Sequence, residues 1–403
     1  MKDGKIHVMV VDDSPAILMV MRAILTELNI HDVATYSCAL EALDAIKQDK
    51  QNIDVIFTDL NMPDMDGMEL IRQLGDIRYP GGIVIISEMD KKVIQLAANL
   101  ARHHSTRLLG NIVKPIQLND VAKMLTKLHL VFDPIDEAIN SPITESLLLE
   151  AISNREITPF YQPKINRATK RITSIEVLAR IVSSDSNQCI LPSRFIGPAE
   201  DLDLINLITF QLFEKATLDF QEFRQTLHGD VKLAFNLSPI QLDDYGCPEK
   251  LALILELNHL KPENVILEIT EQHPLNRPLQ LETLNRLRMR GFDISLDDYG
   301  TGFTNVNQLK TLPLNEIKLD RSLISHIDTD TFSQVIVDSL VDIAQNEGIT
   351  LVAEGIERIE ELNYLERYKN TVLMQGYLIT RPKPKREFLR WTLSWLRMIN
   401  SNQ

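Results

Sequence analysis

The stretch from residue 265 to residue 353 contains four short runs rich in β-branched residues, VILEIT (265–270), FDISLD (292–297), NEIKL (315–319) and ITLVA (349–353). Segments with apolar residues at helical spacing lie between such runs, as in 279–289. Four further runs extend the alternation on both sides, so between residues 159 and 398 we expect eight strands: 160–165, 172–182, 231–237, 265–270, 292–297, 315–319, 349–353 and 372–376. Eight strands that alternate with helices predict an α/β fold, a (β/α)8 barrel of the TIM type.

The first two predicted strands indicate a departure from the regular barrel. The polar run YQPKINRATKR (161–171) turns directly into the second strand, with no room for a helix between them. Because a parallel crossover needs about a dozen residues or more, we expect a hairpin here and therefore a modified barrel.

Seven successive predicted strands each carry a polar group within or just after an apolar run. A strand buried in a barrel needs no such group, and burying one without a partner is costly. Barrel enzymes place their chemistry at the carboxyl ends of the strands. The groups are Glu176, Asn236, Glu268, the pair Asp297 and Asp298, Lys318, Glu354 and Gln375.

The residue types of this set predict a metal site. Carboxylate and amide oxygens, without a cluster of His or Cys, favour Mg²⁺ or Mn²⁺ over zinc. The adjacent Asp297 and Asp298 could serve two ions, and paired ions suit in-line attack of water on a phosphodiester. Lys318 could orient that water or stabilise developing charge.

The first 130 residues show a second alternation of strands and helices. We expect strands at 6–11, 31–36, 53–58, 82–87 and 108–113, with helices that include 16–28 and 39–47. This pattern predicts a doubly wound, five-stranded parallel sheet, whose ligands lie outside the carboxyl ends of the strands.

Five polar residues fall at those predicted strand ends: Asp12, Asp13, Asp59, Ser87 and Lys114. Neighbouring carboxylates repel one another unless a cation lies between them, and three oxygen ligands suit Mg²⁺. An aspartate beside Mg²⁺ and a lysine can accept a phosphoryl group, because both cations stabilise the transferring oxygens.

Residues 1–128 resemble the receiver domain of bacterial response regulators. The resemblance rests on VVDDSP (10–15), FTDLNMPDMDG (57–67), Ser87 and VKP (113–115). It implies that Asp59 is the phosphoacceptor, that Asp12 and Asp13 help to hold Mg²⁺, and that Ser87 and Lys114 contact the phosphoryl group. It also implies a sensor histidine kinase as the phosphodonor. Asn111 stands where the family often has an aromatic residue.

The pattern breaks after residue 130. The segment VFDPIDEAINSPI (131–143) has two prolines and no steady period, which is typical of a linker. Thr144 then suits the N-cap of a short helix that reaches Ile152. We therefore expect a receiver domain at 1–130, a linker at 131–145 and a second domain at 146–398.

Residues 146–395 resemble the EAL phosphodiesterase family, which hydrolyses cyclic di-GMP to the linear dinucleotide pGpG. The name-giving triplet is Glu-Val-Leu in this chain (176–178), which retains the glutamate. The motifs that carry the resemblance are YQP (161–163), EVLAR (176–180), FNLSP (235–239), EITE (268–271), DDYGTGF (297–303), KLD (318–320), AEGIE (353–357) and QGY (375–377).

This second resemblance implies a role for each matching residue. One metal ion would be held by Glu176, Asn236, Glu268 and Asp297, and the other by Asp297, Asp298 and Glu354. Lys318, Glu354 and Asp298 would be catalytic, and Glu271 would brace the loop that begins at Asp298. The implied substrate contacts are Gln162, Leu178, Arg180, Asp320 and Gln375.

Composition and charge exclude several classes of protein function. The 403 residues carry a net charge of −14, which argues against a nucleic-acid binder or an anchor to anionic lipid. No apolar stretch approaches a membrane span, and the three cysteines form neither a disulfide frame nor a zinc site, so we expect a cytoplasmic protein. The alternative to an enzyme is a barrel that binds the dinucleotide or a partner protein without hydrolysis. We also expect a homodimer or a higher homo-oligomer.

The C-terminal segment REFLRWTLSWLRMI (386–399) predicts an amphipathic helix. Trp391 and Trp395 are four residues apart and share one face of it. We expect that face to pack on the barrel, with binding to a membrane surface as the alternative.

Overall fold

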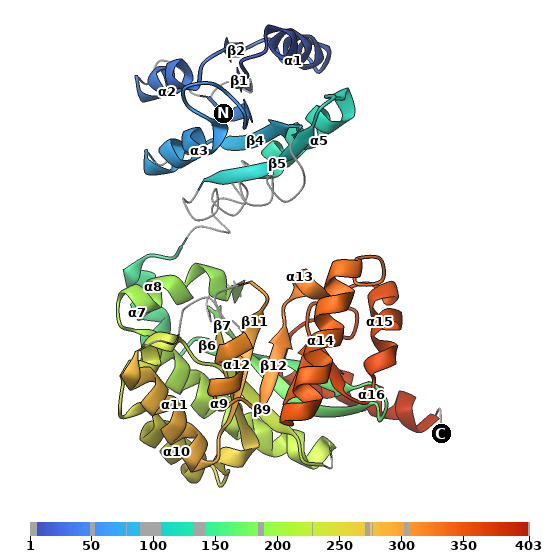
Figure 1. The fold of residues 1–403 in the computed structure, drawn as a ribbon. Coiled ribbons are helices and arrows are strands. Elements are labelled where there is room, and N and C mark those ends of the chain that lie inside the picture. Colours follow the sequence, from blue (N-terminus) through green and yellow to red (C-terminus); the bar gives the residue numbers. More distant parts are fainter. Residues whose placement is uncertain are drawn as a thin grey trace. The chain divides into compact units, whose positions relative to one another are not determined.

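The computed structural model describes residues 6–48, 53–77, 79–88, 106–131, 142–183, 189–227, 229–270, 275, 277–301 and 306–401. The chain divides into two compact units, Met1–Ser141 and Pro142–Gln403 (Figure 1). Most of the predicted linker, residues 132–141, lies outside the described residues.

The first unit contains a five-stranded sheet with the order β2-β1-β3-β4-β5, and every neighbouring pair is parallel. This arrangement confirms the predicted doubly wound fold. Its strands are β1 (Val8–Val11), β2 (Val33–Tyr36), β3 (Val55–Asp59), β4 (Gly82–Ser87) and β5 (Arg107–Val113). Its described helices are α1 (Pro15–Glu27), α2 (Ala39–Lys47), α3 (Gly67–Asp76) and α5 (Leu118–Val131).

Alternation along the strands of this sheet produces two hydrophobic cores. In β1, Val8 and Val10 join a core that includes side chains of α1 and α5, whereas Met9 and Val11 join one with side chains of α2 and α3. A strand that is apolar at every position is therefore buried on both faces, as parallel sheets require.

The second unit is a barrel of eight strands among its described residues. Strand β6 is antiparallel to both β7 and β14, and the other neighbours in the barrel are parallel. The expected hairpin and the modified barrel are thus confirmed. The strands are β6 (Ile157–Asn166), β7 (Arg171–Val182), β9 (Lys232–Asn236), β10 (Val265–Thr270), β11 (Asp293–Tyr299), β12 (Glu316–Leu319), β13 (Thr350–Ala353) and β14 (Val372–Met374).

Helices surround this barrel, and two-residue strands β8 (Cys189–Ile190) and β15 (Lys383–Pro384) extend its sheet. The first helix begins after Thr144, whose hydroxyl accepts a hydrogen bond from the backbone N–H of Leu147 at 3.4 Å, as the N-cap prediction requires. The helices are α7 (Glu145–Ser153), α8 (Ile196–Asp201), α9 (Ile205–Leu227), α10 (Cys247–Leu257), α11 (Pro278–Arg290), α12 (Val306–Thr311), α13 (Arg321–Ile324), α14 (Thr331–Glu347), α15 (Ile359–Leu365) and α16 (Lys385–Ser401).

The last helix, α16, packs on the barrel, which confirms the predicted use of its apolar face. Phe388 is fully buried, and Trp391 and Trp395 stack with ring centroids 5.4 Å apart against the barrel core. The indole N–H of Trp395 donates a hydrogen bond to the carbonyl oxygen of Lys170, 3.0 Å away in the β6–β7 turn. Within the described part of the chain, no helix combines the length and the apolar character needed to cross a membrane.

Candidate functional site

The carboxyl ends of the barrel strands meet around a cavity of about 370 Å³. Glu176, Asn236, Asp297, Asp298 and Lys318 line this cavity from β7, β9, β11 and β12. Glu354 and Gln375 also line it, directly after β13 and β14. Glu268 of β10 lies fully buried beside them. The polar groups predicted for seven strands are therefore gathered at one end of the barrel.

The carboxylates form two groups that share Asp297. One oxygen each of Glu176, Glu268 and Asp297 lie within 4.8 Å of one another, and the same holds for Asp297, Asp298 and Glu354. All of these donors are hard oxygens, and each group has a size that a single divalent ion can span. The residues present therefore fit two divalent ions, and Asp297 belongs to both groups.

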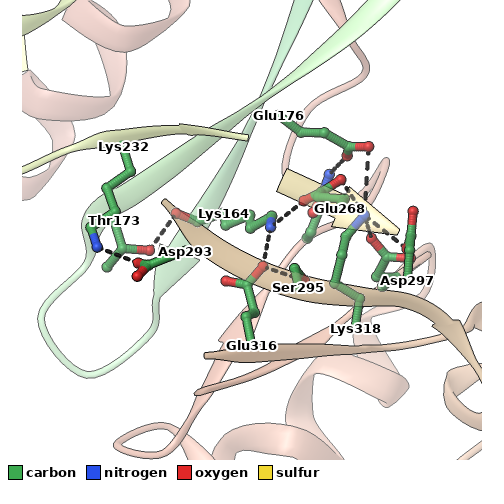
Figure 2. Close-up of polar contacts among 12 residues, drawn as sticks. Lys164, Thr173, Glu176, Lys232, Glu268, Asp293, Ser295, Asp297, Glu316 and Lys318 are labelled. Carbon is green, nitrogen blue, oxygen red and sulfur yellow. Dashed lines mark hydrogen bonds and ion pairs between the residues drawn. The ribbon is translucent and has the colours of Figure 1, made fainter. Parts of the chain in front are cut away.

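Lys318 lies at the centre of these carboxylates and is 1% exposed (Figure 2). Its Nζ is 2.8 Å from Glu354, 2.9 Å from Glu268, 3.0 Å from Asp297 and 3.5 Å from Glu176. Burial disfavours the ammonium form, but these carboxylates outweigh burial and hold the pKa of Lys318 well above its usual range. Lys318 thus lies as a hydrogen-bond donor among these carboxylates.

The acids in the cavity have different electrostatic surroundings. Burial raises the pKa of Glu176 and of Glu354, and burial together with Asp297 raises the pKa of Asp298 to about 6. Burial would also raise the pKa of Glu268, but the ammonium groups of Lys164 and Lys318 outweigh it and lower that pKa to about 2. Cations nearby are therefore what keep a fully buried glutamate ionised.

The backbone of β11 explains how two adjacent aspartates reach one cavity. Successive side chains of a regular strand point to opposite faces. Here the register between β11 and β12 shifts between Leu296 and Tyr299, and Asp298 has a φ of 58°. Gly300 follows with a φ of 110°, where a Cβ would meet the Leu323 side chain at 2.8 Å. This irregularity redirects Asp298, and such local strain is typical of functional sites.

Two glutamines predicted to bind substrate form a chain of hydrogen bonds that ends at Glu176. The amide nitrogen of Gln375 is 2.5 Å from Glu176 and 3.2 Å from the Gln162 amide oxygen. Gln162 donates in turn to the carbonyl oxygen of Thr380 at 3.0 Å. Leu178 and Asp320 also line the cavity.

Two of the residues in the sequence prediction are not placed at the cavity by the structure. Arg180 is absent from the cavity lining; its guanidinium donates to the carbonyl oxygen of Ala179 and lies 5.6 Å from the Phe160 ring centroid. Glu271 lies outside the described residues.

Sequence reasoning does not find Lys164 and Glu316, two buried charges beside this site. Each lies two residues from a predicted site residue, Lys164 from Gln162 in β6 and Glu316 from Lys318 in β12. Since side chains two apart share a face of a strand, this spacing is the signal that could have identified them.

The sheet of the first unit has its own acidic site at the carboxyl ends of the strands. Oxygens of Asp12, Asp13 and Asp59 lie within 4.8 Å of one another, a group that could hold one divalent ion. Lys114 forms ion pairs of 2.7 Å with Asp59 and 2.9 Å with Asp12, and burial raises the pKa of Asp12 despite this lysine. Ser87 is buried at the end of β4. All five predicted residues thus lie at strand ends of this unit.

The chain is similar to several known proteins. It is 29% identical over 387 residues to the cyclic di-GMP phosphodiesterase RocR of Pseudomonas aeruginosa, a match that covers 95% of this chain and 98% of RocR. It is 33% identical over 250 residues to the probable cyclic di-GMP phosphodiesterase PdeG of Escherichia coli K12, covering 62% of this chain and 49% of PdeG.

Solved structures show the same likeness. The PaMucR phosphodiesterase in complex with c-di-GMP is 30% identical with a TM-score of 0.55, covering 60% of this chain and 99% of that one. The EAL enzyme Bd1971, in its cAMP- and cyclic-di-GMP-bound form, is 27% identical with a TM-score of 0.57. This match covers 75% of this chain and 76% of that one.

Two family models match consecutive parts of the sequence. The response regulator receiver domain matches residues 8–126, and the EAL domain matches residues 145–382, which is more than half of the chain. The motifs, the modified barrel and the acids at its strand ends agree with these matches. The chain therefore belongs to the EAL domain family and carries a response regulator receiver domain ahead of its EAL domain.

Proposed function

We propose that this protein is a phosphodiesterase that hydrolyses cyclic di-GMP to pGpG with two divalent ions, Mg²⁺ or Mn²⁺. The observation that carries the proposal is the pair of acidic groups that share Asp297 around the buried ammonium of Lys318. The substrate is inferred from the relatives RocR and PdeG and from the PaMucR complex with c-di-GMP.

The chain's own residues would hold the two ions in separate places. Glu176, Asn236, Glu268 and Asp297 would bind one ion, and Asp297, Asp298 and Glu354 the other. When bound, the ions would stabilise negative charge on the attacking and leaving oxygens of the phosphodiester.

Lys318 would act as a hydrogen-bond donor. Its Nζ lies within 3.0 Å of oxygens of Glu268, Asp297 and Glu354, so it is placed to donate to an attacking water or to a phosphate oxygen at the same group. Gln162, Leu178, Asp320 and Gln375 line the same cavity and would orient the dinucleotide. Arg180, which is absent from the lining, is proposed as a further contact from the resemblance of its motif alone.

The test is turnover of cyclic di-GMP by the purified full-length protein with Mg²⁺ or Mn²⁺, with pGpG measured by chromatography. We expect activity that EDTA abolishes. Glu176→Gln should lower kcat by about 100-fold or more, because it removes a metal ligand. Glu214→Gln, which alters an exposed ion pair with Arg155, is the matched control and should retain activity.

The same assay decides between an enzyme and a sensor. If the wild-type protein binds cyclic di-GMP in the presence of Mn²⁺ but releases no pGpG, the enzymatic proposal fails and a binding module is the better account.

We further propose that a histidine kinase phosphorylates Asp59 in the receiver domain and that the protein acts as a homodimer or a higher homo-oligomer. The basis for the first part is the arrangement of Asp12, Asp13 and Lys114 around Asp59. A phosphoryl group on Asp59 would be stabilised by Lys114 and by a cation among the three aspartates.

A further inference from the structure

Lys164 is a fully buried lysine in β6 to which the proposed chemistry assigns no role. Its Nζ is 2.6 Å from Oε1 of Glu268 and 2.5 Å from Oε1 of Glu316. Both glutamates lie on other strands, β10 and β12. A buried lysine is costly unless its charge is compensated, and here two carboxylates supply that compensation.

The contacts divide the two oxygens of Glu268 between two lysines (Figure 2). Lys164 contacts Oε1, whereas Lys318 contacts Oε2 at 2.9 Å. Behind Lys164, Glu316 is held by the hydroxyl of Ser295, which donates to its Oε1 at 3.0 Å. The carboxylate plane of Glu268 is therefore fixed from both sides.

Glu316 also balances the charge of Lys164. A lone ammonium this close to a metal ligand would repel a divalent ion, because the Coulomb energy is large in a water-poor interior. The Lys164–Glu316 pair has no net charge, so its repulsion of a divalent ion is small, while the contact of Lys164 with Oε1 still fixes the orientation of Glu268.

We propose that Lys164, anchored by Glu316, is a positioning residue that holds Oε1 of Glu268 and so keeps Oε2 on the side of Lys318, in the acidic group with Glu176 and Asp297 where a divalent ion would bind. The inference rests on the proposed function in that it assumes a divalent ion at this group. Groups that orient metal ligands in this way typically change metal affinity or activity by about 10- to 100-fold when they are removed.

The charge balance allows a test that separates orientation from electrostatics. The double variant K164M/E316Q removes one positive and one negative charge, so the net charge of the site is unchanged, and it leaves no unpaired buried ion. The matched control is K232M/D293N, which removes the partly exposed ion pair between Lys232 and Asp293 of the same barrel. Dissociation constants for Mn²⁺ alone are measured by electron paramagnetic resonance, and folding is checked by circular dichroism.

We expect K164M/E316Q to bind Mn²⁺ about 10- to 100-fold more weakly than the wild type, and K232M/D293N to bind it within about twofold. A constant for K164M/E316Q that is unchanged or tighter overturns the proposal. If the wild type binds Mn²⁺ but does not hydrolyse cyclic di-GMP, the proposed function fails while the positioning role is still measured.

A second variant covers the case in which the double variant does not fold. K164Q keeps a hydrogen-bond donor and leaves Glu316 in place, but it removes a positive charge near the metal. At a pH where Glu268 stays ionised in both proteins, the loss of a positive charge alone predicts tighter Mn²⁺ binding by K164Q, whereas loss of orientation predicts weaker binding. Weaker binding supports the proposal, and equal or tighter binding contradicts it.

Discussion

Gly376 allows two loops of the barrel to meet at the candidate site. A Cβ at this position would lie 2.2 Å from the carbonyl oxygen of Ile356 and 2.3 Å from its nitrogen. The close approach is reinforced by backbone hydrogen bonds from Ile356 to Gln375 and from Gln375 to Ala353. Gln375, which contacts Glu176, is therefore positioned by the absence of a side chain on its neighbour.

Gly376→Ala should disturb the site more than the fold. The added methyl group must push the two backbones apart, which we expect to cost about 1–3 kcal/mol of unfolding free energy. Displacement of Gln375 should lower kcat by about tenfold or more. The measurements are thermal denaturation and steady-state hydrolysis of cyclic di-GMP.

The control for this variant is Gly197→Ala in α8, where a Cβ would have no heavy atom within 4 Å. It should be neutral or slightly stabilising, because alanine suits a helix better than glycine. Equal behaviour of the two alanine variants would contradict the role assigned to Gly376.

The sequence predicts the acidic residues of the site better than the buried residues that hold those acids in place. A carboxylate at the end of an apolar strand is conspicuous because it is costly to bury, so Glu268 and Asp297 are found readily. Lys164 escapes notice because lysine is usually a surface residue, and its burial is explained only by its contacts with Glu268 and Glu316 from two other strands. Contacts between strands far apart in sequence depend on the closed barrel.

At the scale of elements, the sequence predicts the positions of the strands well. It does not predict where the pairing between strands becomes irregular. The predicted strand 265–270 coincides with β10, and 172–182 differs from β7 by one residue. The register shift in β11 depends on pairing with β12 and on the positive φ of Asp298, and neither follows from apolar spacing.

Helix α16 allows a test of how much its packing contributes to the stability of the barrel. Trp395→Ala removes the stack on Trp391 and the hydrogen bond to Lys170. We expect a loss of about 2 kcal/mol of unfolding free energy, less than for a fully buried tryptophan because the side chain is only partly buried. Urea denaturation followed by circular dichroism measures this loss.

Leu393→Ala serves for comparison, because Leu393 lies on the same helix and is 47% exposed. It should change the unfolding free energy by less than about 0.5 kcal/mol. A small effect of Trp395→Ala would mean that α16 contributes little to the stability of the barrel.

At the scale of the whole molecule, the sequence indicates two units because two alternating patterns are separated by a break near residue 131. The structure also divides the chain in this region, between Ser141 and Pro142. Among the described residues, the hydrophobic cores of the two units contain no residue in common, so each unit buries a core of its own.

Phosphorylation at Asp59 should change the activity of the other unit. We expect a small-molecule phosphodonor such as acetyl phosphate, with Mg²⁺, to alter kcat of the wild type and to leave Asp59→Asn unaffected, because the amide cannot form the acyl phosphate. Lys114 and the three aspartates provide the charges that such a transfer needs.

Asp76→Asn is the matched variant, since Asp76 is an exposed partner of Arg72 in α3. It should respond to the phosphodonor as the wild type does. A response that persists in Asp59→Asn would place the acceptor elsewhere.

The stacked indoles of α16 provide an intrinsic fluorescence signal for the unfolding of the EAL unit. The sequence holds two tryptophans, and both lie in this helix of the EAL unit. Selective excitation of indole therefore yields emission from the barrel alone, while the far-ultraviolet dichroism sums the helices of both units. When the two signals are followed through one denaturation, coincident curves indicate a single cooperative transition, and separated curves identify which unit unfolds first.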